Sequence, residues 1–366
     1  MTQTNIWTPL EIESEGVGGA GELVERLDDM GPGELTRMLT EEKGLVFRGF
    51  EVTHGSLDEV LGRLLPNRLA YVHGNSPRTK VGSNVYTSTE YPREFTISMH
   101  NEMSYAHSWP ARLAFYCQVQ PGGGGATPVV DAALWLDSLD SEVREAFAGG
   151  VRYVQNLHDG YGLGKSWQDT FETTSREEVE AFLAPAGADW KWQADGGIRV
   201  SSVRPATARH PVTGTEVWFN QADQWHPAGL GDDTAAALAQ IMPEDDLPQN
   251  VTFADGSPIP AEYVAQIRDR GLEHAVDVDW RTGDLLLIDN VLLAHGRRPF
   301  TGDRHRQLPD TSGPAPNPPL IHRITRSRAS AATAGGRSLG GCGSEDGASG
   351  ATGPSPTAAA AVTGRG

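Results

Sequence analysis

Short apolar runs separated by glycine-rich turns recur along the chain, and several of them alternate apolar with polar positions as β-strands do. The clearest runs cover residues 45–50, 112–119, 276–280 and 285–289. Residues 81–99 are also rich in Val, Tyr and Thr, which favours strands. Because Thr282 and Gly283 are turn formers between the last two runs, we expect those runs to pair as a hairpin.

Helical patterns occur between these runs rather than in a block of their own. Residues 21–43 carry a helical pattern that Gly44 ends, and further helices are predicted over residues 136–150, 232–242 and 260–271. Many short strands with a few helices predict a mainly β, α+β fold, a β-sandwich or jelly roll with helical insertions.

Composition and charge exclude some classes of partner. The chain has 366 residues, of which 38% are hydrophobic and 21% charged, with a formal net charge of −18. A surface this acidic repels phosphate groups, so we expect neither nucleic acid nor an anionic membrane as a partner. No apolar run is long enough to span a bilayer, and the N-terminus lacks the pattern of a signal peptide. With two cysteines, Cys117 and Cys342, the chain fits a reducing cytoplasm.

The composition changes sharply near Leu308. Residues 311–344 contain no Asp or Glu, and a run rich in proline interrupts the place where a further strand would follow. We therefore predict a folded domain over residues 1–306 and a disordered Pro/Gly/Ala-rich tail over residues 307–366. A coding frame shifted after about Arg306 would produce the same break, and both explanations stay open.

Two histidines and one glutamate form the candidate metal site. His100 and Glu102 stand two positions apart, so on a strand their side chains would point to the same face. His295 follows a buried apolar strand and precedes a basic cluster. Two imidazoles and one carboxylate are the ligand set of non-haem Fe(II) enzymes, although Zn and Mn also accept it.

Three segments together resemble one enzyme family. "HNE" at residues 100–102, "PGGGGATPVVD" at residues 121–131 and "GDLLLIDNVLLAHGRRPFTGDR" at residues 283–304 are similar to the TauD/TfdA family of Fe(II)/2-oxoglutarate-dependent dioxygenases. The glutamate in "HNE" resembles the clavaminate synthase-like branch. Within that branch the chain is most similar to SyrP-like amino acid hydroxylases of peptide antibiotic pathways.

The resemblance implies a fold, cofactors and roles for single residues. The fold would be a double-stranded β-helix, with His100, Glu102 and His295 as ligands of Fe(II). Thr127 would help to bind the carboxylate of 2-oxoglutarate, and Arg304 or Arg306 would pair with that carboxylate. O₂ would be the second co-substrate, with succinate and CO₂ as products. The carboxylate ligand implies hydroxylation or desaturation, because related halogenases lack it to make room for chloride.

The substrate implied by the resemblance is a small molecule, either a free amino acid or an aminoacyl group on a peptidyl carrier protein. Candidate pocket residues are Asn84, Trp167, Phe171, Phe219 and Asn220, although core packing explains the aromatic ones equally well. Two other functions stay open. One is a catalytically impaired member that binds an amino acid or carrier domain, and the other is a Zn-dependent hydrolase. The sequence does not indicate an oligomeric state.

Overall fold

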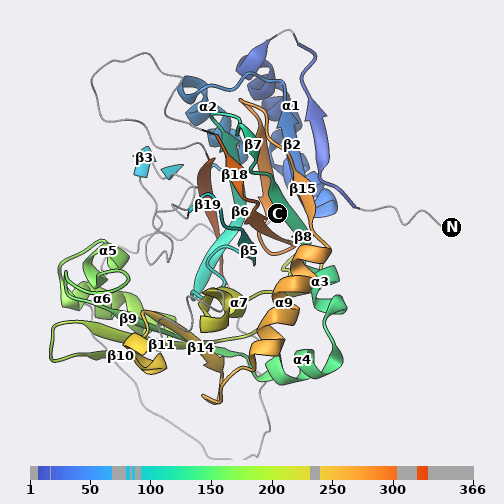
Figure 1. Cartoon of the computed structure of the whole chain (residues 1–366). Coiled ribbons are helices and arrows are strands. Elements are labelled where there is room, and N and C mark those ends of the chain that lie inside the picture. Colours follow the sequence, from blue (N-terminus) through green and yellow to red (C-terminus); the bar gives the residue numbers. More distant parts are fainter. Residues whose placement is uncertain are drawn as a thin grey trace, which may run out of the picture. The chain divides into compact units, whose positions relative to one another are not determined.

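A computed structural model describes residues 7–16, 18–67, 80–82, 85–86, 92–230, 240–302 and 320–328 (Figure 1). The described residues belong to one compact unit, Met1–Arg328. Two sheets in this unit contain most of the strands that position the candidate site.

The larger sheet has seven strands and includes β6, the longest strand among the described residues. Its order is β1 (Leu10–Glu13), β2 (Gly44–Arg48), β16 (Leu285–Asp289), β6 (Ser108–Cys117), β19 (Leu320–Arg328), β4 (Val85–Tyr86) and β3 (Lys80–Gly82). Strands β2 and β16 are buried along their whole length, as their continuous apolar runs require. Apart from the parallel pair β1–β2, neighbouring strands are antiparallel.

The second sheet has four antiparallel strands and carries the candidate site. Its order is β15 (Val276–Val278), β8 (Thr127–Asp131), β17 (Leu293–Arg297) and β5 (Ile97–His100). One hydrophobic cluster joins the two sheets, because it contains Phe115 and Leu286 of the larger sheet together with Val129 and Leu293 of the smaller. Two sheets over a shared core match the predicted jelly-roll class with helical insertions.

A third sheet and two short pairs complete the β-structure. The third sheet has the order β10 (Asp189–Trp192), β11 (Ile198–Arg204), β9 (Val151–Leu157) and β14 (Gln249–Phe253). The short pairs are β12 (Thr207–Arg209) with β13 (Glu216–Trp218), and β7 (Gly123–Gly124) with β18 (Phe300–Thr301).

Helices fill the connections between the strands. The α-helices described are α1 (Gly19–Glu42), α2 (His54–Leu64), α3 (Ala132–Ser138), α4 (Ser141–Ala146), α5 (Trp167–Phe171), α6 (Arg176–Leu183), α7 (Ala222–Trp225) and α9 (Ala261–Glu273). Helix α1 has a kink at Gly31, whose φ is 68°, because Pro32 cannot continue the helical hydrogen bonding. In the part of the chain that the structure describes, no helix is long and apolar enough to cross a membrane.

Most of the predicted elements form, with two differences in the helices. Helices α1 and α9 confirm the predictions over residues 21–43 and 260–271. The helix predicted over residues 136–150 is divided into α3 and α4, because Leu139 adopts an extended backbone between them. The helix predicted over residues 232–242 lies largely outside the described residues.

The predicted hairpin is wrong. Strands form at residues 276–278 and 285–289, but β15 pairs with β8, whereas β16 pairs with β2 and β6 in the other sheet. Between them the chain passes from one sheet to the other, and the amide of Gly283 donates to the carbonyl of Cys117 in β6. The alternation in the sequence indicated two strands, but it carried no information about their partners.

The strand β19 lies inside the segment predicted as a tail. Its nine residues follow the proline-rich run and pair with β6, from Leu320 opposite Cys117 to Arg328 opposite Ser108. The prolines therefore precede a strand of the sheet, and the Ile and Thr residues after them suit strand pairing. Disorder over the rest of the predicted tail stays a prediction, because residues 307–319 and 329–366 lie outside the described ones.

Candidate metal and co-substrate site

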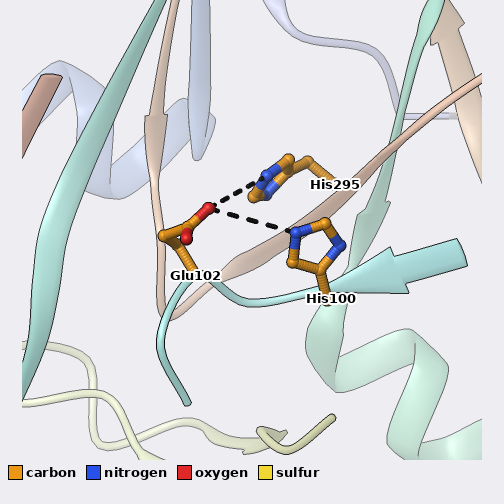
Figure 2. Close-up of side chains that lie close together, drawn as sticks. All are labelled: His100, Glu102 and His295. Carbon is orange, nitrogen blue, oxygen red and sulfur yellow. Dashed lines mark ion pairs between the residues drawn. The ribbon is translucent and has the colours of Figure 1, made fainter. Parts of the chain in front are cut away.

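Two neighbouring strands and one turn bring His100, Glu102 and His295 together (Figure 2). His295 of β17 is the direct register partner of His100 at the end of β5. Opposed residues of an antiparallel pair point to the same face, so both imidazoles lie on one face of the sheet. Glu102 stands in the turn that follows β5 rather than in the strand, which differs from the predicted i, i+2 arrangement.

The three side chains fit a single metal ion. One Oε atom of Glu102 lies 4.0 Å from Nε2 of His100 and 3.8 Å from Nε2 of His295. An ion midway between either pair would sit about 2 Å from each atom, which is an ordinary metal–ligand distance. The residues are 8%, 3% and 3% exposed in chain order, so few waters compete with an ion for them. The donor set can hold Fe(II), as the sequence predicted.

A hydrogen bond prepares His100 for metal binding through Nε2. Its Nδ1 lies 2.9 Å from the carbonyl oxygen of Ser98, and metal binding through Nε2 would place the ring proton on Nδ1, where this oxygen can accept it. The lone pair of Nε2 then points toward Glu102. The side chain of Gln224, from α7, also contacts both groups, at 3.1 Å from the Ser98 carbonyl oxygen and 3.0 Å from Nδ1.

Thr127 lies on the same face of the sheet as the two histidines. His295 is opposite Val129 of β8, and Thr127 stands two positions before Val129, so their side chains share a face. The hydroxyl of Thr127 accepts a hydrogen bond of 3.0 Å from the indole N–H of Trp280, and it is 2% exposed. The remaining hydrogen of this hydroxyl is therefore the part that can be donated to a ligand.

The arginines expected to bind the co-substrate, Arg304 and Arg306, lie outside the described residues. The two arginines just before them have other partners. Arg297 is buried and donates to the carbonyl oxygens of Pro92 and Phe95, while Arg298 forms an ion pair of 2.9 Å with Asp277.

The predicted substrate residues are packed in different clusters. Trp167 and Phe171 belong to the aromatic cluster of the third sheet, where their rings contact Trp192 and Phe182. The ring of Phe219 contacts Trp109. These are contacts of core packing, and a substrate role for these residues stays a prediction.

Asn220 is buried, and Asn84 lies outside the described residues. The amide of Asn220 donates to the carbonyl of Ala206 and accepts from the amide of Ala222. The next residue, Gln221, donates to the carbonyl of Asn101 between the first two candidate ligands. The segment that contains Asn220 therefore contacts the site through a different residue.

Four polar residues that support the site were missed from the sequence: Asn101, Gln224, Trp280 and Asn290. Each contacts a residue more than one hundred positions away in the chain, a spacing that is too long for a pattern to reveal. For example, Gln224 and His100 are 124 positions apart.

Beside Gln224, a buried carboxyl changes the electrostatics of this region. Burial raises the pKa of Asp223 to about 6, because the charged form loses its hydration. Asp223 lies in α7 directly before Gln224, whose side chain contacts His100, so the carboxyl gains or loses its charge close to that contact.

Comparison with known proteins shows the family. The sequence profile of the family described as "Taurine catabolism dioxygenase TauD, TfdA family" matches residues 7–308. The dapdiamide synthesis protein DdaC of Enterobacter agglomerans is 35% identical over 272 residues, which cover 74% of this chain and 82% of that protein. A clavaminate synthase-like protein of Arabidopsis thaliana is 31% identical over 280 residues, with the same two coverages.

Among solved structures, the PvcB protein of Pseudomonas aeruginosa has a TM-score of 0.45 and 16% identity, with coverage of 87% of this chain and 86% of that one. This likeness is too distant to add to the assignment. The profile and the two relatives are sufficient: the chain belongs to the TauD/TfdA family and is a 2-oxoglutarate-dependent oxygenase that uses Fe(II).

Proposed function

We propose that this protein hydroxylates an unactivated C–H bond of an amino acid, free or carried on a peptidyl carrier protein, in a pathway of secondary metabolism. The observation that carries the proposal is the buried His100, Glu102 and His295 set, which can hold one ion and leaves coordination positions for ligands from outside. Bound Fe(II), with 2-oxoglutarate and O₂, supplies the oxidant that such a reaction requires.

Each residue of the site has a defined task in this proposal. His100, Glu102 and His295 hold the iron, and the hydrogen bond from Nδ1 of His100 to the Ser98 carbonyl keeps Nε2 available as a ligand. Thr127 donates its hydroxyl hydrogen to a carboxylate oxygen of 2-oxoglutarate, because its oxygen already accepts from Trp280.

A guanidinium after His295 completes the co-substrate site, and we assign it to Arg304 or Arg306. A guanidinium holds a carboxylate through two parallel N–H···O bonds, so it also fixes the orientation of 2-oxoglutarate. Separate Arg304→Ala and Arg306→Ala variants decide between the two, because the one that binds the co-substrate loses 2-oxoglutarate affinity by about tenfold or more.

The presence of Glu102 supports hydroxylation rather than halogenation. A carboxylate in the third ligand position occupies the place that a chloride would need. The relative DdaC, by its name, takes part in the synthesis of dapdiamide, which supports an amino acid or aminoacyl substrate and a role in antibiotic biosynthesis. We also expect the enzyme to be cytoplasmic.

Succinate formation tests the proposal. The purified protein with Fe(II), 2-oxoglutarate and O₂ is assayed against a panel of free amino acids and the same aminoacyl groups on a carrier protein. We expect one substrate to accelerate succinate release and to gain 16 mass units, about the mass of one oxygen atom. Products that instead gain a chlorine, or an acceleration by no amino acid in either form, would contradict the proposal.

A further inference from the structure

One buried amide holds the main chain of Glu102 from both sides. The N–H of Glu102 donates to Oδ1 of Asn290 over 2.7 Å, and Nδ2 of Asn290 donates to the carbonyl of Glu102 over 3.1 Å. We propose that Asn290 is a positioning residue that fixes the carboxylate of Glu102 for metal binding. The proposal rests on the proposed function, in which Glu102 is a ligand.

The hydrogen bonds of Asn290 require an amide in one orientation. Its Nδ2 also donates to the carbonyl of Pro110 over 2.8 Å, and the side chain has no exposure to solvent. A flipped amide would place NH₂ against the N–H of Glu102 and an oxygen against two carbonyl oxygens. An aspartate at this position keeps the acceptor and loses both donations, whereas an aliphatic side chain loses all three bonds.

Glu102 needs such support because no strand holds it. The strand β5 ends at His100, and the turn that follows places Met103 in the left-handed region, with φ 57°. A residue other than glycine adopts this conformation only where its surroundings impose it. The two hydrogen bonds between Asn290 and Glu102 hold the N–H and the carbonyl of the residue immediately before Met103, and they therefore define the direction in which the Glu102 side chain leaves the backbone.

The support also connects the ligands to each other. Nδ2 of Asn101 donates to the carbonyl of Asn290 over 2.7 Å and to that of Leu293 over 3.1 Å. Leu293 begins β17, which carries His295. The side-chain amide of Asn101 thus bonds the turn to the segment that leads into β17, and the side-chain amide of Asn290 bonds that segment back to the turn. These contacts hold the carboxylate of Glu102 and the imidazole of His295 in place before a metal binds.

The test is a double-mutant cycle on Co(II) affinity, measured by calorimetry with the metal alone and without turnover. Asn290→Asp should weaken Co(II) binding by about 10- to 100-fold, the usual effect of losing a residue that supports a metal ligand. In the Glu102→Ala background, the same substitution should change Co(II) affinity by less than about twofold, because the residue through which Asn290 acts is gone.

The matched control is Asn156→Asp. Asn156 also donates through Nδ2 to two carbonyls, those of Asp245 and Leu247, and accepts through Oδ1 from Arg199, but it lies on β9 in the third sheet. The Asn156→Asp substitution should therefore leave Co(II) affinity unchanged. If Asn290→Asp does not fold, Asn290→Ser, which keeps a smaller acceptor, replaces it in the cycle.

The outcomes separate the two proposals. Unchanged Co(II) affinity in a folded Asn290 variant, while Glu102→Ala loses affinity, overturns the positioning role alone. An equal loss in the Glu102→Ala background also overturns it, because Asn290 then acts by another route. Unchanged affinity in Glu102→Ala itself shows that Glu102 is no ligand and contradicts the proposed function.

Discussion

His100 and His295 are direct register partners across β5 and β17, and the centroids of their rings lie 4.3 Å apart. Ordinary strand pairing therefore brings together two imidazoles that are nearly two hundred positions apart in the chain. Just beyond this pair, between His295 and Arg297, the register shifts in a bulge. The shift places Arg297 opposite Ile97, so the register that sets the two histidines opposite each other changes immediately after His295.

Substitution of Gly296, which lies in the bulge and is not a metal ligand, should weaken metal binding indirectly. A Cβ added at Gly296 would lie 2.5 Å from the carbonyl oxygen of Ile97 and 3.2 Å from Sδ of Met99. The two strands must then move apart, so Gly296→Ala should lower the free energy of unfolding by about 1–3 kcal/mol and also weaken metal binding. Denaturant unfolding and metal titration measure the two effects.

Gly33→Ala is the control, because it should change the free energy of unfolding in the opposite direction. Apart from the adjacent residues and the backbone of its own helix, no atom lies within 4 Å of a Cβ at Gly33 in α1, and alanine is the better helix former. Its stability should rise by up to about 1 kcal/mol with no change in metal affinity. A Gly296→Ala protein as stable as this control would show that the close approach of β5 and β17 is not required.

Removal of one imidazole should abolish metal binding at useful concentrations. His295→Ala leaves one histidine and one carboxylate, so we expect affinity for Fe(II) to fall by on the order of 100-fold or more, and turnover to cease. His274→Ala, at the C-terminal end of α9, is the control and should bind iron normally. Turnover that survives in His295→Ala would exclude His295 as a ligand.

The hydroxyl of Thr127 should affect the co-substrate rather than the metal. Thr127→Val should raise the KM for 2-oxoglutarate about tenfold, as expected when a charged group loses one hydrogen bond, with metal affinity unchanged. Thr170→Val is the control, since Thr170 is buried and donates to the carbonyl of Ser166 away from the site. An unaltered KM in Thr127→Val would refute the role.

Trp280 provides a second test of the same contact. Thr127→Val leaves the indole N–H of Trp280 buried without its acceptor, which should cost about 1–3 kcal/mol of stability. Trp280→Phe removes that donor but also shortens a core side chain, so the loss in the double variant should be smaller than the sum of the two single losses. Strictly additive losses in thermal or denaturant unfolding would show that the two side chains are not coupled.

The buried Asp223 should make stability fall as the pH rises. Its pKa is raised from 3.8 to about 6 by burial, so between these values the folded protein holds a proton that the unfolded chain has released. The free energy of unfolding therefore decreases across that window, by up to about 3 kcal/mol, and stays lower above it. Asp223→Asn should remove this slope and be the more stable protein at pH 7.

The exposed Asp255 is the comparison for that experiment. Hydrogen bonds from Ser257 lower its pKa, so its contribution to stability is present above the unfolded pKa and is lost as the pH falls. Asp255→Asn should therefore remove a small effect of opposite sign. If Asp223→Asn leaves the pH dependence of unfolding between about pH 4 and 6 unchanged, its carboxyl is not desolvated in the fold.

The sequence indicated the three residues of the candidate metal site, but not the contacts that support them. His100, Glu102 and His295 have a ligand chemistry that is visible in residue types, and the apolar strand before His295 shows that it is buried. Asn290 and Gln224 could not be recognised, because an amide shows no sign of its role until its distant partner is known. The strands β15 and β16 show the same limit, since alternation predicts a strand and not the sheet it joins.

The most direct test of the central claim is an anaerobic titration with Fe(II) and 2-oxoglutarate, followed in the visible spectrum. The intact protein should develop a metal-to-ligand charge-transfer band that requires both components, and His295→Ala should develop none. No band with freshly prepared Fe(II) and folded protein, or an equal band in His295→Ala, would contradict an Fe(II)/2-oxoglutarate site built on His100, Glu102 and His295.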